Sequence, residues 1–282
     1  MATDLYQLVT DKIIAQLEAG VIPWVKPWTE GGSGAPMNAT TGKKYRGINQ
    51  LLLVPPAAGN SWLTFNQARD CGANVRKGEK AQQIVFFKPW EMKDKNDPDA
   101  AGKMIPLLKG YFVFHTSQVD NLPAKFEPVP IAPMPEFERI AAADKILSQA
   151  VILHGGDKAF YSPGHDKITL PRAEQFRAIG DYYATALHEL THWTGHEKRC
   201  ARDFSGRFGS TAYAREELVA EIGAAFMMNS CQIEGEMQHA AYLASWLAVL
   251  KEDKRAILSA SSAAQKAVDF LIPAEAAELV AA

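Results

Sequence analysis

Two histidines and a glutamate stand at a spacing that can hold and use a metal ion. His188 and His192 are four residues apart in a segment with helical hydrophobic periodicity, so both imidazoles lie on one helix face and can reach one cation. Glu189 lies about 100° further round the helix, where it can take a proton from an attacking water without binding the metal. Because this HExxH pattern falls on a predicted helix, we prefer this interpretation to an amphipathic helix that carries two histidines by chance.

A catalytic zinc site usually has a third protein ligand, and the sequence offers one on a second helix. Within residues 213–226, Glu217 and Glu221 share one face, and small neighbouring residues allow this helix to approach the first closely. We assign Glu217 as the third ligand and Glu221 as the acceptor for a ligating histidine's free N–H. The reverse assignment, or two solvated glutamates, also fits the spacing. His196 would lie about 12 Å from His188 along a continuous helix, so we expect it at the surface or beside the ligands.

The arrangement resembles the gluzincin metallopeptidases, in which HExxH precedes a helix with a ligand glutamate and a second carboxylate four residues later. The resemblance implies that the strand within residues 166–171 is an edge strand that pairs with an extended peptide substrate. It also suggests Tyr213 as the group that stabilises the developing oxyanion, although a core position is an equal alternative. Two histidines and a glutamate suit one divalent cation, zinc first and manganese or cobalt as alternatives.

Aromatic and basic residues are interspersed through residues 20–125. Single-stranded nucleic acid binds to such surfaces, because bases stack on aromatic faces and cations contact the phosphates. The same aromatics can instead form the core of a small α/β domain, and composition leaves both interpretations open. The residues that we select as DNA contacts are Lys43, Lys44, Tyr45, Arg46, Arg76, Lys77, Lys80 and Lys88.

Charge is divided unequally along the chain. Residues 1–125 hold 15 Lys and Arg against 11 Asp and Glu, a net of +4, and the remainder holds 15 against 21, a net of −6. The two halves are therefore expected to have different partners. Three scattered cysteines argue against a disulfide framework or a cysteine-rich zinc module. The first residues do not form a signal peptide and no apolar run spans a bilayer, so we expect a cytoplasmic protein without a membrane partner.

Five prolines within residues 122–135 predict an extended tether, because proline fits neither a helix interior nor a central strand. The tether divides the chain into a DNA-binding domain (1–122), a Pro-rich linker (123–135) and a metal-site domain (136–282). We predict an α+β protein: a small N-terminal α/β domain with a short sheet, and a mainly helical C-terminal domain with the HExxH helix and an edge strand. Expected strands are 83–87, 109–114 and 167–170, with a charged excursion at 93–103. Expected helices are 4–19, 64–71, 136–150, 172–180, 181–196, 213–230, 236–259 and 262–271.

Several motifs in order resemble the ArdC family of plasmid antirestriction proteins. They are TGKKYRGIN at 41–49, WLTFNQA at 62–68, VRKGEK at 75–80, YFVF at 111–114 with Gln118 and Val119, HELTHWTGH at 188–196, and the segment 213–221. The resemblance covers nearly the full length. It implies an N-terminal single-stranded-DNA-binding domain joined to a C-terminal zincin-like metallopeptidase domain. It also implies a role in conjugation, in which the protein shelters incoming DNA from the recipient's restriction system.

Three functions remain as hypotheses. The first is an antirestriction protein that binds single-stranded DNA and also cleaves a protein, such as a restriction component. The second is a DNA-binding shield in which the metal is structural or the site is proteolytically inactive. The third is a housekeeping metallopeptidase without affinity for DNA.

Overall fold

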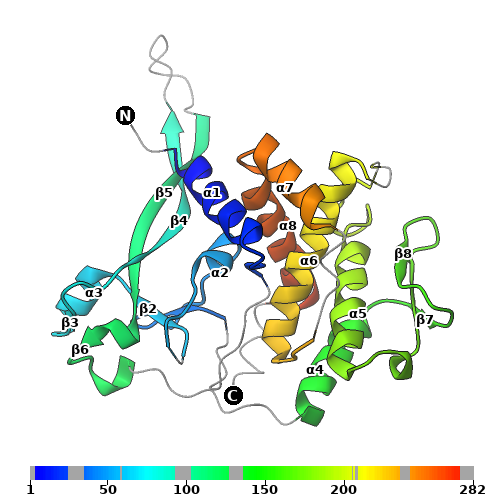
Figure 1. The fold of residues 1–282 in the computed structure, drawn as a ribbon, viewed down its shortest axis with the longest axis horizontal. Helices are drawn as coiled ribbons and strands as arrows, with labels where there is room; N and C mark the ends of the chain where they lie inside the picture. Colours follow the sequence, from blue (N-terminus) through cyan, green and yellow to red (C-terminus); the bar gives the residue numbers. More distant parts are fainter. Residues whose placement is uncertain are drawn as a thin grey trace.

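The structure is a computed structural model that describes residues 4–24, 35–57, 59–92, 103–126, 136–204, 206, 209–235 and 242–273. The N-terminal half contains a sheet with short helices, and the C-terminal half is mainly helical with one small sheet (Figure 1). The predicted α+β class is confirmed. The expected polar loop at 29–34, most of the excursion at 93–103 and most of the tether at 123–135 lie outside the described residues.

The N-terminal half begins with helix α1 (Leu5–Glu18), close to its predicted bounds. The Asp4 carboxylate caps it by accepting hydrogen bonds from two backbone N–H groups of the first turn, groups that a helix start leaves without intrahelical partners. Two short helices follow, α2 (Ile48–Leu52) and α3 (Phe65–Asp70). Thr64 opens α3 with a capping box, which explains why the chain turns helical at this point.

A four-stranded sheet lies beside these helices in the order β1–β2–β5–β4. Its strands are β1 (Met37–Asn38), β2 (Ser61–Leu63), β4 (Gln82–Met92) and β5 (Lys103–His115). Strands β4 and β5 form a long antiparallel hairpin that extends beyond both predicted strands, because backbone pairing continues to Met92 and Lys103. Two further short strands, β3 (Asn74–Val75) and β6 (Val119–Asp120), pair with each other beside α3.

The two faces of the β4–β5 hairpin have different neighbours. On one face, Gly110 lies so close to α1 that an added Cβ would meet the Leu5 side chain at 3.2 Å. On the other face, the end of the hairpin near β2 is covered by a small apolar cluster. This cluster consists of Tyr45, Leu53, Trp62, Ile84 and Val113.

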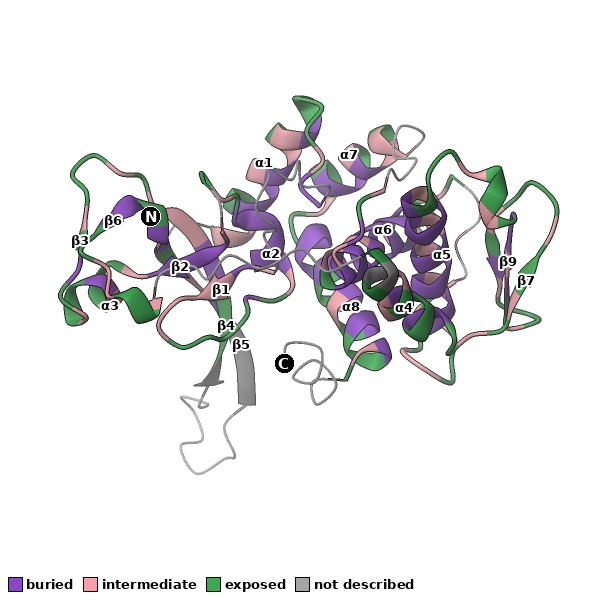
Figure 2. Ribbon diagram, turned by 90° about the horizontal axis from the view of Figure 1, so that it is seen from below, coloured by how far each residue is buried: buried purple, intermediate pink, exposed green. Residues whose placement is uncertain are grey.

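The C-terminal half is built around two long helices, α5 (Ile179–Thr194) and α6 (Thr211–Cys231). Helix α6 packs against both α5 and α8, and the sides that face one another are buried (Figure 2). An added Cβ on Gly223 of α6 would lie only 2.6 Å from Cγ2 of Thr191 on α5. The absence of a side chain at Gly223 therefore sets the short separation of these helices. The other helices are α4 (Glu136–Leu147), α7 (Leu243–Glu252) and α8 (Ala256–Leu271).

Two helix predictions are wrong. Residues 172–180 form only a 3-10 turn, Ala173–Gln175, before α5 starts. The predicted helix 236–259 is interrupted after α7 by Asp253, whose carboxylate accepts a hydrogen bond from the Arg255 N–H at 2.8 Å and pairs with Arg215 of α6 at 2.9 Å. These tertiary and turn contacts override a continuous apolar pattern. Residues 236–241 of that prediction are not described.

The strand predicted at 167–170 exists as β9 (Lys167–Leu170), but its place in the sheet differs from the prediction. The three-stranded sheet has the order β7–β9–β8, with β7 (Ile152–His154) parallel to β9 and β8 (Phe160–Ser162) antiparallel to it. Both edges of β9 are therefore occupied by its neighbours. The expectation that a peptide substrate pairs with β9 is corrected, because backbone groups that already pair within the sheet cannot accept another strand.

One hydrophobic core extends through both halves of the chain. Trp24, from the N-terminal half, packs edge-on against Trp246 of α7 at 5.4 Å between ring centroids. At the same junction, Thr10 of α1 donates a hydrogen bond to the carbonyl oxygen of Lys254 at 2.7 Å, and Gln265 of α8 accepts one from the Gly47 N–H at 3.0 Å. Within the described residues, no helix is both long and apolar enough to cross a membrane.

Candidate metal centre

Helix α5 presents His188 and His192 on one face, as predicted from their spacing. Their Nε2 atoms are 3.1 Å apart and their ring centroids 4.8 Å apart. The opposite side of this helix is held in the core by buried residues such as Leu187 and Leu190. This burial fixes the rotation of α5, so both imidazoles point toward α6.

Helix α6 brings the Glu217 carboxylate to the same point. Glu217 Oε2 lies 3.4 Å from His188 Nε2, and Oε1 lies 3.5 Å from His192 Nε2. Tetrahedral ligand atoms around an ion with bonds of about 2.0–2.1 Å are about 3.3 Å apart. The three donor atoms therefore have the chemistry and the mutual separations that one divalent cation requires.

Each imidazole has a second carboxylate at its other ring nitrogen. Glu216 Oε1 lies 3.1 Å from His192 Nδ1, and Glu221 Oε1 lies 3.7 Å from His188 Nδ1. Glu216, Glu217 and Glu221 are all buried. Acceptors at Nδ1 orient an imidazole and select the tautomer with Nε2 free for a metal. Glu221 lies on the His188 side of the cluster, at a distance longer than a hydrogen bond, and its role as an acceptor stays a prediction. Glu216 was not among the predicted site residues.

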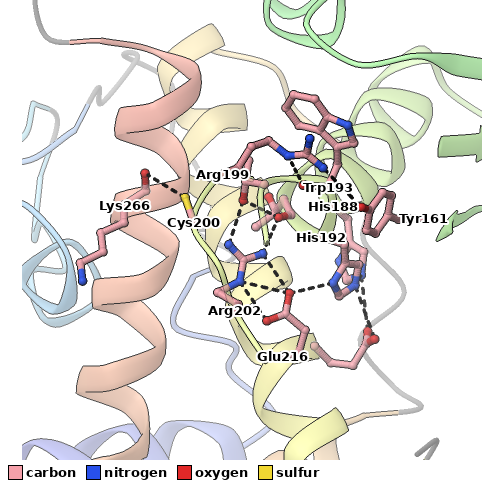
Figure 3. Close-up of polar contacts among 12 residues, drawn as sticks. Tyr161, His188, His192, Trp193, Arg199, Cys200, Arg202, Glu216 and Lys266 are labelled. Carbon is pink, nitrogen blue, oxygen red and sulfur yellow. Dashed lines mark hydrogen bonds and ion pairs between the residues drawn. The ribbon is translucent and has the colours of Figure 1, made fainter. Parts of the chain in front are cut away.

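Arg202 holds Glu216 in place. Its guanidinium Nε and Nη2 lie 3.0 Å and 2.9 Å from the two carboxylate oxygens of Glu216, and Nη1 donates a hydrogen bond to Thr194 Oγ1 at 2.8 Å (Figure 3). This fork-like contact joins the loop after α5 to α6 beside His192. In the sequence, the Arg202–Glu216 contact is indicated only by the position of Glu216 next to Glu217. Arg202 lies in an irregular loop, where no periodicity shows which side chains lie together.

The charges at this site stabilise one another. Burial alone would lower the pKa of both imidazoles. The hydrogen bond with Glu217 nevertheless raises the pKa of His188, and those with Glu216 and Glu217 raise the pKa of His192 to about 10. Burial would likewise raise the pKa of Glu217, but the two imidazoles hold it well below its usual range. The Glu217 carboxylate is therefore already ionised when a cation displaces the protons from the imidazoles.

The predicted catalytic residues flank this cluster. Glu189 is buried, and its negative charge contributes to the raised pKa of both histidines. Tyr213 lies one turn before Glu217, with its hydroxyl 3.3 Å from the Tyr242 hydroxyl. Burial, the bond to Tyr242 and the nearby Glu217 all raise the pKa of Tyr213, so this phenol stays protonated and can donate a hydrogen bond.

His196 lies outside the ligand cluster. Helix α5 ends at Thr194 with Gly195 as its C-cap, and His196 Nδ1 accepts a hydrogen bond from the Lys198 N–H at 3.2 Å. The chain turns away from the helix axis here, which removes His196 from the face that carries the two ligands. This position agrees with the expectation that His196 is not a ligand.

The predicted DNA contacts fall into three groups. Five are exposed lysines that have no ion-pair partner within the described part of the chain: Lys43, Lys44, Lys77, Lys80 and Lys88. The two arginines form ion pairs instead, Arg46 with Asp269 of α8, and Arg76 with Glu79 at 3.0 Å. Tyr45 is only 6% exposed and belongs to the cluster beneath the sheet, so its ring face is not open to a base.

Known families match the two halves of the chain. Residues 3–114 match the N-terminal domain of the anti-restriction factor ArdC, and residues 137–263 match a zincin-like metallopeptidase. The second match contains His188, Glu189, His192 and Glu217. The helices that carry the candidate ligands therefore belong to a zincin-like domain.

Two solved structures are similar over almost the entire chain. The metal-free structure of the antirestriction protein ArdC from plasmid R388 is 39% identical, with a TM-score of 0.81, and the match covers 98% of this chain and 99% of that one. The Mn(II)-bound structure of the same protein is 39% identical, with a TM-score of 0.77 and 98% of both chains covered. A zincin-like domain and a relative with bound Mn(II) support the binding of a divalent cation at this site.

Curated relatives include much longer proteins. Two DNA primases TraC from Escherichia coli are 41% and 40% identical over 96% of this chain, but the chain spans only 20% and 27% of their length. The uncharacterized protein y4eC from Sinorhizobium fredii is 38% identical, and the match covers 95% of this chain and 92% of that protein. Because the match to the R388 protein runs from end to end in both sequence and fold, the chain belongs to the ArdC family of antirestriction proteins.

Proposed function

We propose that this protein protects single-stranded DNA from restriction during conjugation, in the cytoplasm of the recipient cell, and that it carries a zinc-dependent peptidase site. The observation that carries the proposal is the convergence of His188 Nε2, His192 Nε2 and one Glu217 oxygen within 4.8 Å. This convergence occurs in a chain that aligns end to end with an antirestriction protein. Residues 1–122 would bind the DNA and residues 136–282 would hold the cation.

The protein groups around the cation have separate roles in this proposal. A bound divalent cation supplies a Lewis acid that polarises a substrate carbonyl and lowers the pKa of a water. Glu189 accepts the proton that the water loses and returns it to the leaving amine. Tyr213 keeps its own proton and donates a hydrogen bond to the oxygen on which negative charge develops. Two neutral imidazoles and a carboxylate favour zinc, and Mn(II) is the alternative that the related structure suggests.

The basic N-terminal half supports DNA as the partner. The five exposed lysines have no ion pair with any residue that the structure describes, so they are available to contact phosphates, in contrast to Arg46 and Arg76, whose charges are already paired. Since one hydrophobic core runs through both halves, separating them would expose apolar surface to water. Tests are therefore best made on the full-length protein.

A second function is a DNA-binding shield in which the cation stabilises the fold without catalysis. It is favoured by the small exposed fractions of the ligand side chains, 14% for His188, 11% for His192 and 6% for Glu217. Buried ligands on two packed helices suit a structural site as well as a catalytic one.

The substitution Glu189→Gln separates the two functions. It keeps the size of the side chain and leaves all three ligands in place, so cation binding and DNA binding should remain. Under the peptidase proposal, hydrolysis of a test protein and protection against restriction both fall at least about 100-fold, the scale of a lost general base. If protection survives undiminished in Glu189→Gln, the shield is the correct function. Glu197→Gln, at an exposed position just after the end of α5, is the control.

A further inference from the structure

One face of the β4–β5 hairpin bears aromatic and basic side chains together. In the antiparallel register, Ile84 pairs with Tyr111 and Phe86 with Lys109, and residues that pair directly lie on the same face. Lys88 comes two residues after Phe86 on the same strand, so its side chain lies on the same face. The face formed by Phe86, Lys88, Lys109 and Tyr111 is called the hairpin platform below.

The aromatic rings of the hairpin platform are exposed yet supported from below. Phe86 is 46% exposed and Tyr111 is 44% exposed, and their rings contact each other at 5.8 Å in an edge-to-face arrangement. The buried Tyr45 ring lies 6.5 Å from Phe86. Two neighbouring, half-exposed aromatic rings over a packed base form an apolar patch whose ring surfaces a partner can contact.

The charge of the hairpin platform points to an anionic partner. Lys88 is exposed and Lys109 is half-buried, and neither has an ion-pair partner among the described residues. The turn that carries Lys43 and Lys44 leads directly into Tyr45 below the rings. Lys43 and Lys44 therefore add positive charge to the chain segment that leads into the residue packed beside Phe86.

We propose that the hairpin platform is the surface on which single-stranded DNA stacks its bases. Unpaired bases expose π-faces that rings such as those of Phe86 and Tyr111 accept regardless of sequence, while Lys88 and Lys109 contact the phosphates between them. A duplex hides its base faces in the helix stack, so this surface selects the single strand. The inference rests on the proposed DNA-binding function and assigns that function to a specific face.

The hairpin itself supplies a matched control. Phe112 is next to Tyr111 on the same strand, is 60% exposed, and points to the opposite face. Binding of a fluorescent oligothymidylate of about 20 nucleotides, longer than typical single-strand site sizes, is measured by anisotropy with the full-length protein. The double variant Phe86→Ala/Tyr111→Ala should bind about tenfold more weakly or worse, and Phe112→Ala should bind like the wild type. Phe86→Leu/Tyr111→Leu keeps the apolar bulk and should lose affinity in the same way.

The contribution of Lys88 and Lys109 is tested by the dependence of DNA affinity on salt concentration. For single strands, each phosphate contact contributes about 0.7 to the slope of log K against log salt concentration. Lys88→Ala/Lys109→Ala should therefore flatten the slope by about 1.4, whereas the exposed pair Lys158→Ala/Lys167→Ala in the C-terminal half should leave it unchanged.

The outcomes separate the two proposals. If the wild type binds single strands and the ring variants, folded as judged by an unchanged Tm, bind equally well, the platform assignment is overturned while DNA binding stands. If the wild type binds no single-stranded DNA, both fail. Equal or tighter binding of a duplex of the same length to the wild type would also overturn the platform assignment.

Discussion

Glu216 Oε1 lies 3.1 Å from Nδ1 of His192, and the same carboxylate is held by two nitrogen atoms of Arg202 (Figure 3). One imidazole of the candidate centre is thus oriented by an ion pair that connects α6 to the loop after α5. The other, His188, has Glu221 at its Nδ1 at the longer distance of 3.7 Å. The two histidines therefore differ in how firmly their rings are positioned.

Loss of the Glu216 charge should weaken both the cation site and the fold. In Glu216→Gln, affinity for Zn(II) should fall about 10-fold to 100-fold, as for other groups that orient metal-bound histidines. The buried Arg202 would also lose its counter-charge, at a cost of about 3 kcal/mol in the free energy of unfolding. Isothermal titration with Zn(II) and thermal unfolding measure the two effects. Unchanged affinity would mean that Glu216 has no part in positioning His192.

Substitutions of Glu217 and of Glu221 should lower the affinity for a cation to different extents. The two glutamates stand one turn apart on α6, but Glu217 faces the Nε2 atoms of both histidines, whereas Glu221 lies on the Nδ1 side of His188. Glu217→Gln should abolish measurable binding of stoichiometric Zn(II), and Glu221→Gln should reduce affinity by about 10-fold. The reverse ranking in a titration with Zn(II) would make Glu221 the third ligand.

The spacing of α5 and α6 should be sensitive to a single methyl group. Gly223→Ala would place a Cβ 2.6 Å from Thr191 Cγ2 and 2.9 Å from its Oγ1, and such overpacking costs about 1–3 kcal/mol. Because separation of the helices also moves Glu217 away from the histidines, cation affinity should fall together with Tm. Gly164→Ala is the control, since no described atom lies within 4 Å of that added Cβ. Equal Tm values for the two variants would disprove close packing at Gly223.

The Asp166–Arg199 ion pair gives a pH dependence with a defined sign. The hydrogen bond from Arg199 holds the pKa of Asp166 below its ordinary value of 3.8. A depressed carboxyl pKa contributes stability that is present above pH 3.8 and is lost as pH falls through the folded-state pKa. Asp166→Asn tolerates the left-handed backbone at this position, φ 50°, and removes only the charge. It should lower stability by up to about 1 kcal/mol at pH 7 for a partly exposed pair.

The Tm difference between wild type and Asp166→Asn should therefore shrink progressively below pH 3.8. Differential scanning calorimetry from about pH 2.5 to about pH 7 measures this Tm difference. A constant difference at all pH values would show that the substitution acts through packing and not through the charge.

Within each of the two helices, the sequence predicts which candidate ligands share a face, because helix geometry is local. His188 and His192 share a helix, and Glu217 and Glu221 share another, so helical periodicity alone determines which side chains lie together within each helix. The same periodicity predicted the helices that the structure shows at Leu5–Glu18 and Phe65–Asp70, whose first turns are capped by Asp4 and Thr64.

Features that depend on distant contacts could not be predicted in this way. Arg202 reaches Glu216 from an irregular loop, the position of β9 between β7 and β8 depends on strand pairing, and Asp253 ends α7 through bonds that include Arg215 of another helix. None of these contacts leaves a periodic signal. The aromatic residues of the N-terminal half show the same limit, because tertiary packing alone makes Tyr45 a buried member of the cluster beneath the sheet and leaves Phe86 exposed on the hairpin.

The most direct test of the metal centre is an anomalous difference map from crystals of the full-length protein grown with Zn(II) or Mn(II). The map should show one strong peak within about 2.0–2.3 Å of His188 Nε2, His192 Nε2 and a Glu217 carboxylate oxygen. A map without a peak at this place, or with the ion held by other side chains while the two imidazoles point apart, would contradict the account.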